Sequence, residues 1–149
     1  MTDIFNKLLG VLLAFALLVG APLAINTMSK ELTMNRSVMN EMTNLINRVA
    51  DSGRLTDEDL TDFYLGISSY GMTMDATIKR YAKVVNPDGA GGTYVSYVLN
   101  DDNTSWNKGD IIQVNVNAID FTAAQHIRHR LLHMNPPKFE QTLAAMVRR

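Results

Sequence analysis

The sequence predicts an α+β fold: a long N-terminal helix that leads to a small antiparallel-sheet head with two short helices. Two observations predict this fold. An uncharged apolar run over residues 8–25 continues without a break into an amphipathic helical pattern that reaches Val49. Further along the chain, the spacing of apolar residues changes from the helical period to a period of two, which is typical of strands with one solvated face. We therefore expect a helical domain over residues 1–51 and a head domain over residues 52–149.

The apolar run is long enough to cross a membrane. Its 18 residues, at ~1.5 Å each, span about 27 Å, close to the ~30 Å of a bilayer's hydrocarbon core. Pro22 lies within it, and in a transmembrane helix we expect a proline to cause a local bend rather than an end. The alternative is a cleaved secretory signal with Lys7 as its positive residue, but Pro22 makes the cleavage sites after Ala21 and Ala24 poor. We expect a retained anchor.

The amphipathic pattern over residues 26–51 has more apolar surface than a small head is able to cover. Its apolar residues recur in steps of four and three, a heptad-like pattern. A helix of residues 4–51 would be roughly 70 Å long, whereas a domain of ~100 residues has a radius of gyration near 13 Å. The last two turns, over residues 45–49, fit packing against the head equally well. The residues expected to contact lipid or other copies are Leu13, Leu17, Pro22, Met28, Leu32, Met39, Met42 and Ile46.

The first part of the head is expected to be a short helix followed by strands. Thr56 precedes three acidic residues and has the pattern of a helix N-cap, with the helix ending near Ser69. Period-two alternation predicts strands over residues 72–83, 93–99 and 111–118, and the turn residues at 86–92 separate the first two. We expect these three strands to form a meander.

The last part of the head is expected to contain a third helix and a fourth strand. Thr122 with Gln125 three residues later is a capping-box pattern, and this helix is expected to reach about Met134, before two consecutive prolines. Residues 139–147 alternate as a strand. A strand after such a helix is expected to rejoin the sheet by a right-handed crossover.

Composition excludes several classes of function. The chain has no cysteine, which excludes thiol catalysis and zinc–thiolate sites. The chain has a net charge of −1, so it is not attracted to nucleic acid as a basic protein would be. We therefore expect no nucleic-acid partner. The sequence has neither a nucleophile elbow nor a phosphate-binding loop. We expect no enzymatic activity and no cofactor.

Four residues of the head are candidate partner contacts. His126, His129 and His133 share one face of the third helix, but their spacing does not place all three on one metal ion, and no carboxylate lies beside them in sequence. We therefore expect a solvated or interface-facing polar surface there, and no metal site. Trp106, the sole tryptophan, is expected either to plug the edge of the sheet or to contact a partner.

An apolar N-terminal helix with a proline at position 22, joined directly to an amphipathic half and a small sheet-containing head, resembles the type IV pilins and the pilin-like proteins of tight-adherence systems. The resemblance implies that residues 8–25 pack in a filament core, that Pro22 marks a bend or melted segment, and that residues 28–49 contact neighbouring copies. The chain departs from the family in having Phe5 where mature pilins usually have a glutamate, and the apolar sequence after Gly10 is too short for the family's usual glycine-terminated leader to end there.

These observations together lead us to expect a structural subunit of a pilus-like surface filament that assembles through its N-terminal helix. Its expected partners are other copies of itself, membrane lipid before assembly, and membrane assembly machinery. It would lie in the cytoplasmic membrane first and in an extracellular filament afterwards. The alternative is a single-span accessory component of a secretion or conjugation complex that does not polymerise. A third reading, an exported soluble binding protein, requires cleavage near Ala24.

Overall fold

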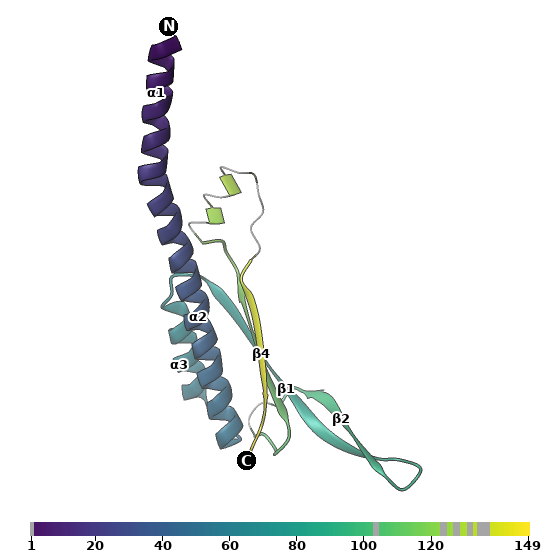
Figure 1. Cartoon of the computed structure of the whole chain (residues 1–149). Coiled ribbons are helices and arrows are strands. Elements are labelled where there is room, and N and C mark those ends of the chain that lie inside the picture. The colour runs from purple at the N-terminus through teal and green to yellow at the C-terminus, as the bar shows by residue number, and fades with distance from the viewer. Residues whose placement is uncertain (1, 103–104, 123–124, 127–128, 131–132, 134–137) are drawn as a thin grey trace. The chain divides into compact units, whose positions relative to one another are not determined.

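The computed structural model describes residues 2–102, 105–122, 125–126, 129–130, 133 and 138–149 (Figure 1). The chain divides into two compact units, Met1–Asn35 and Arg36–Arg149, which we call the N-terminal and C-terminal units. The fold is α+β, with a long apolar N-terminal helix, a short helix and a four-stranded antiparallel sheet. This confirms the fold class expected from the sequence.

The N-terminal unit is helical from its first described residue. Helix α1 (Thr2–Phe15) continues through a π-helical turn, η1 (Ala16–Gly20), into α2 (Ala21–Ser52). A proline removes one backbone donor and its ring crowds the carbonyl four residues earlier, which for Pro22 belongs to Leu18, inside η1. The wider π turn accommodates this crowding, so the helix continues past the proline.

The C-terminal unit begins within α2 and buries one side of that helix. Val38, Met42, Leu45, Val49 and Ala50 have no exposed surface. They recur at helical spacing and therefore form a single apolar stripe. At the end of the helix, the backbone N–H of Arg148 donates to the carbonyl of Ala50 at 2.8 Å, and the Arg148 guanidinium meets Asp51 at 2.7 Å. These contacts join the last turn of α2 to the C-terminal segment.

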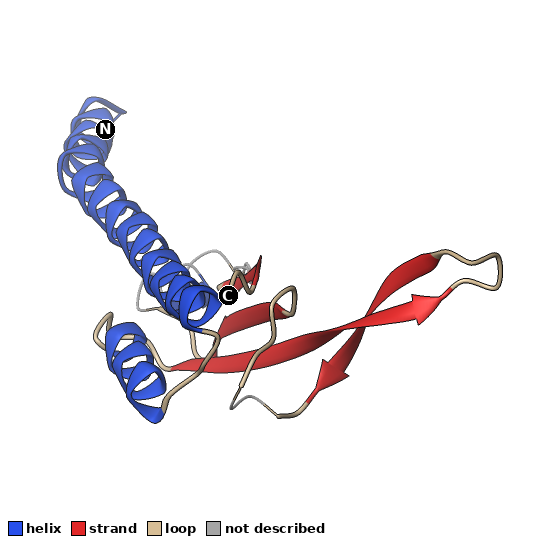
Figure 2. Ribbon diagram, turned by 90° about the horizontal axis from the view of Figure 1, so that it is seen from below, coloured by secondary structure: helices blue, strands red, loops and turns tan. Residues whose placement is uncertain are grey.

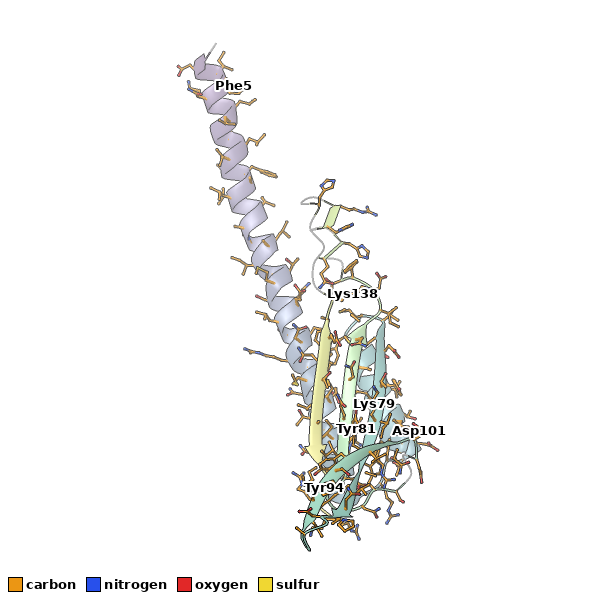
Figure 3. The ribbon with its side chains drawn as sticks, turned by 90° about the vertical axis from the view of Figure 1, so that its right-hand side faces the viewer. Phe5, Lys79, Tyr81, Tyr94, Asp101 and Lys138 are labelled. Atoms are coloured by element: carbon orange, nitrogen blue, oxygen red, sulfur yellow. The ribbon has the colours of Figure 1, made fainter. Side chains whose placement is uncertain are left out.

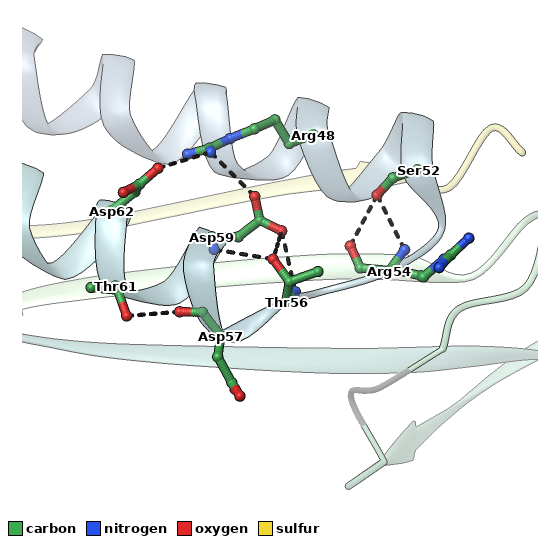
Figure 4. Close-up of polar contacts among 8 residues, drawn as sticks. All are labelled: Arg48, Ser52, Arg54, Thr56, Asp57, Asp59, Thr61 and Asp62. Atoms are coloured by element: carbon green, nitrogen blue, oxygen red, sulfur yellow. Dashed lines mark hydrogen bonds and ion pairs between the residues drawn. The ribbon is translucent and has the colours of Figure 1, made fainter.

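Helix α3 (Asp57–Ser68) begins with the N-cap that the sequence predicted. The Thr56 hydroxyl accepts a hydrogen bond from the Asp59 backbone N–H at 3.1 Å, and the Asp59 carboxylate accepts one from the Thr56 backbone N–H at 3.2 Å (Figure 4). Arg48 of α2 lies 3.2 Å from Asp59 and 3.4 Å from Asp62. The reciprocal cap fixes the start of α3, and the arginine links it to α2.

The sheet comprises β1 (Met74–Pro87), β2 (Thr93–Asn100), β3 (Ile111–Ala118) and β4 (Glu140–Met146), in the order β2-β1-β3-β4. All neighbouring strands are antiparallel. The expected meander is wrong, because β1 is long enough to pair with β3 through its first half and with β2 through its second half. The expected crossover is also wrong, because β4 joins as the antiparallel neighbour of β3.

One face of the sheet forms the core with the helices. Ile112, Val114, Val116 and Ala118 of β3 alternate inward, as the sequence predicted, and are at most 5% exposed. Phe63 and Ile67 of α3 are buried with them. The residues between them on β3 are only partly buried, so the core lies on one side of the sheet alone.

The second half of β1 leaves the sheet with β2 as its only partner. Pairing with β3 ends at Tyr81, whereas pairing with β2 continues to Pro87. Within the C-terminal unit, Figure 2 shows this hairpin reaching away from α3 and from the other strands. We call residues 82–98 the arm.

The third predicted helix is described only in part. Its capping box is present, because Thr122 and Gln125 exchange backbone-to-side-chain hydrogen bonds of 3.0 and 3.1 Å. Gln125, His126, His129 and Arg130 are helical. The predicted end near Met134 and the stop at the two prolines lie outside the described residues.

Candidate functional site

The N-terminal unit presents apolar side chains to its surroundings over its whole described length. Fifteen large apolar side chains between Ile4 and Leu32 are exposed, Phe5 among them (Figure 3). The helix that contains them, residues 3–52, is long and apolar enough to cross a membrane, and its most apolar 18-residue window has no residue buried within the chain. This surface is the candidate functional site.

Most of the residues expected to contact lipid or other copies lie on this surface. Leu13, Leu17, Met28 and Leu32 are each more than half exposed. Pro22 is exposed as well.

The other three predicted assembly residues lie in the C-terminal unit. Met39 is partly buried. Met42 and Ile46 are 0% and 3% exposed, so they belong to the core of their own unit and are not carried forward as contacts with other copies. Ile46 lies in the last two turns, for which packing against the head was an equal expectation, whereas Met42 lies before them. The spacing alone does not separate the two cases, because a helix packed on its own domain and a helix packed on other copies show the same apolar pattern.

The energetic consequence of this exposure is large. Moving one Leu, Ile or Phe side chain from water to apolar surroundings stabilises by about 1.5–3 kcal/mol. For the 15 side chains, which are already partly covered, the free energy gained when lipid or protein covers the rest of their surface is on the order of 20 kcal/mol. An apolar surface of this size on a soluble monomer is typical of contact with a membrane or with other proteins.

A buried ion pair, which sequence reasoning did not identify, organises the junction of β1 and the loop before β3. The Arg80 guanidinium donates to Asp110 at 2.7 and 2.9 Å, and to the Asp102 carbonyl at 2.9 Å. The other bonds to Asp110 come from the backbone N–H groups of Lys83 and Asn107, each at 2.9 Å. The only sign in the sequence was an arginine at an inward position of an alternating strand.

The hydrogen bonds to Asp110 determine its ionisation. Burial alone would raise the pKa of this carboxyl, but the backbone donors Lys83 and Asn107, together with Arg80, lower the pKa below its ordinary value. Asp110 therefore stays charged, and its charge is matched by Arg80. Arg80 and Asp110 find their hydrogen-bond partners within the chain, so we assign this ion pair a role in the fold and not in ligand binding.

Trp106 belongs to the same cluster. It is 5% exposed, and Arg80 lies over its ring at 5.7 Å from the ring centre. Its side chain is therefore buried, so it offers little surface to a partner, and its expected place at the edge of the sheet stays a prediction.

The three histidines are exposed, as expected for a solvated or interface-facing surface. His126 lies 3.4 Å from Asp120, and the Phe121 ring packs edge-on against His126 and parallel to His129. The described residues contain no group of three or more His, Cys, Asp or Glu side chains placed to hold a metal ion.

An open polar pocket lies beside the end of α2 in the C-terminal unit. Its lining includes Asp51 and Asp59 as well as Arg54 and Arg149. Because both signs of charge line it and Arg48 is paired with acidic residues of α3, the pocket favours neither an anion nor a cation.

The comparisons with known proteins add no family to these observations. Neither a protein-family model, nor a curated protein, nor a solved structure matches the chain.

Proposed function

We propose that the chain is a membrane-inserted structural subunit of a pilus-like filament, and that it assembles through its N-terminal helix. The observation that supports this proposal is the set of 15 exposed large apolar side chains between Ile4 and Leu32, which its own chain leaves uncovered in the described residues. Lipid covers such a surface before assembly, and the helices of other copies cover it afterwards. The subunit would therefore pass from the cytoplasmic membrane into a filament outside the cell.

The proposal distinguishes two parts of the N-terminal helix by chemistry. Residues 8–25 carry no charge and match the hydrocarbon thickness. Met28 and Leu32 lie beyond this stretch, among polar and charged residues, and are still more than half exposed. Lipid tails do not explain two exposed apolar residues in a polar segment, whereas a neighbouring helix does.

Electron microscopy of full-length protein tests this assignment. The variant Leu32→Gln keeps a good helix former and leaves residues 8–25 unchanged, so membrane insertion is preserved while the apolar contact is lost. We expect regular fibres from the parent chain and from Lys30→Gln, a polar control on the same helix, and shorter or no fibres from Leu32→Gln.

Two results would contradict the proposal. Fibres of unchanged length from Leu32→Gln would remove this residue from the contact between copies. A parent chain that stays a membrane-embedded monomer under conditions of high local concentration would favour the single-span accessory component instead.

A further inference from the structure

The arm is a two-stranded ribbon with no third strand or helix against it among the described residues. Ala82–Pro87 of β1 pair only with Thr93–Val98 of β2, through a loop closed by a 2.8 Å hydrogen bond from the Asp88 N–H to the Gly92 carbonyl. An isolated two-stranded hairpin is marginally stable in water, and it usually gains stability by packing on another element.

Both faces of the arm and its adjoining strand end carry exposed apolar side chains. The face that continues the core side of the sheet presents Val84, Tyr94 and Val98, and the opposite face presents Val85, Val95, Tyr97 and Leu99. These seven side chains are 36–58% exposed. Tyr94 lies on the arm and Tyr81 where the arm leaves the sheet (Figure 3). The arm is therefore apolar on both faces, and among the described residues neither face is covered by a helix.

The outer edge of β2 is open for backbone pairing. No described strand pairs with this edge, and the only isolated bridge in the described chain joins Arg54 to Ser105. Edge strands of soluble proteins are usually protected by charges, prolines or bulges. The eight residues of β2 include no charged residue and no proline.

The other edge of the same sheet provides a matching partner. Strand β4 has seven residues, close to the eight of β2, and its only charged residue is Glu140 at its start. Because every neighbouring pair in the order β2-β1-β3-β4 is antiparallel, β2 and β4 run in opposite directions. When two copies point in the same direction, β2 of one copy is therefore antiparallel to β4 of the other.

The pleat of the sheet limits how these two edges pair. Val95 lies on the same face as Val85, and Ala144 lies on the same face as Lys79, which is the face away from the core. One antiparallel register keeps the core side of both sheets on the same side and also lets every residue of β4 pair with β2. In that register, Val95 lies opposite Ala144. Val85 and Lys79 are six residues apart on β1, so the two copies would be offset by about 20 Å along the strands, at ~3.4 Å per residue.

The apolar side chains of the arm add to the area of a backbone-paired contact between copies. Five of these seven side chains are Val or Leu and two are Tyr, and each is 36–58% exposed. The backbone edge adds to this, and a standard interface buries ~800 Å² per partner.

We propose that the arm of one copy docks on the outer edge of β4 in a second copy and extends its sheet. This inference rests on the proposed function, since copies in one filament share a direction, and it adds a second contact outside the N-terminal helix. The contact is heterologous, because different edges of the two copies meet, so it repeats along an open assembly.

Disulfide crosslinking in the full-length chain tests the docking directly, because the chain has no cysteine of its own. Chains carrying Val95→Cys are mixed with chains carrying Ala144→Cys, assembled and oxidised. We expect mixed dimers from this pair and a background level from Glu58→Cys mixed with Ala144→Cys, since Glu58 is exposed on α3.

A second variant tests the edge itself. Tyr97→Lys, combined with Val95→Cys, adds a charge to the outer edge of β2 and should lower the yield of mixed dimers roughly tenfold. The control Thr77→Lys adds the same charge at an exposed position of β1 that pairs with Asn115 of β3 and lies outside both proposed docking edges, so it should leave the yield unchanged.

The outcomes separate this inference from the proposed function. Fibres without mixed dimers above background would overturn the docking and leave the helix-driven assembly standing. Disulfides formed within Val95→Cys chains alone would also overturn it, because they would place β2 against β2. If mixed dimers form while the parent chain makes no fibres, the docking stands and the filament proposal fails.

Discussion

At the scale of single residues, Arg80 and Asp110 form a buried ion pair in the C-terminal unit, and each depends on the other for its counter-charge. Both side chains are at most 5% exposed, and the two charges are 2.7 Å apart. A buried pair of this kind costs desolvation when it forms, but removing one partner leaves the other charge buried and unmatched. Trp106 packs on the same arginine, so its fluorescence reports on the integrity of the cluster.

The lowered pKa of Asp110 makes the stability of the C-terminal unit depend on acid. A carboxyl whose pKa is lower in the folded than in the unfolded chain stabilises the fold above its unfolded pKa, and this contribution is lost as the pH falls through the folded pKa. We expect the contribution to be constant from pH 7 to pH 5 and to decline below about pH 4. Trp106 fluorescence during thermal unfolding at a series of pH values measures this decline.

Asp110→Asn is the matching variant. It should lower the free energy of unfolding at pH 7 by about 3–5 kcal/mol, because Arg80 loses its counter-charge, and it should reduce the decline below pH 4. Asp75→Asn, an exposed carboxyl on the same strand as Arg80, serves as the control. A parent chain and an Asp110→Asn variant with equal stability at pH 7 would contradict this account.

At the scale of elements, the N-cap of α3 is the most local stabilising feature. Thr56→Ala removes both the hydroxyl acceptor and its bond to Asp59, and should lower the free energy of unfolding by about 1 kcal/mol. Thr61→Ala, on the same helix, removes a hydroxyl that bonds to the Asp57 carbonyl and should be neutral or slightly stabilising, because alanine is the better helix former. Equal losses from the two variants would contradict the cap assignment.

The elements show how far the sequence determines the fold. Thr56, Thr122 and the inward side of β3 were predictable, because capping and alternation are local patterns and require only neighbours in sequence. The order of the strands was not predictable in the same way. It depends on the length of β1, whose two halves pair with different strands.

The candidate site was predictable in part for the same reason. Most of the exposed apolar surface between Ile4 and Leu32 follows from the uncharged run over residues 8–25, which is visible in the sequence itself. The burial of Met42 and Ile46, and the pairing of Arg80 with Asp110, arise only when distant segments meet. Residues 30 positions apart in sequence give no local signal of their contact.

At the scale of the whole molecule, the account depends on surfaces that the chain does not cover within its described residues. The N-terminal unit exposes apolar side chains along its helix, and the arm exposes them on both faces of a hairpin. Each surface implies a contact beyond the single chain, and the two contacts differ in kind. The first is helix against lipid or helix, and the second is strand against strand.

The central claim is that lipid or other copies cover the apolar N-terminal helix. The most direct test measures whether water reaches this helix when the chain is in a membrane or in an assembly. Full-length chains with Leu13→Cys or Leu17→Cys are treated with a membrane-impermeant maleimide, with Glu58→Cys as the exposed control. We predict that, in the native state, Leu13→Cys and Leu17→Cys react far more slowly than Glu58→Cys. After complete denaturation, all three variants should react at the same rate. Equal rates at all three positions in the native state would show a helix open to water and would contradict the account.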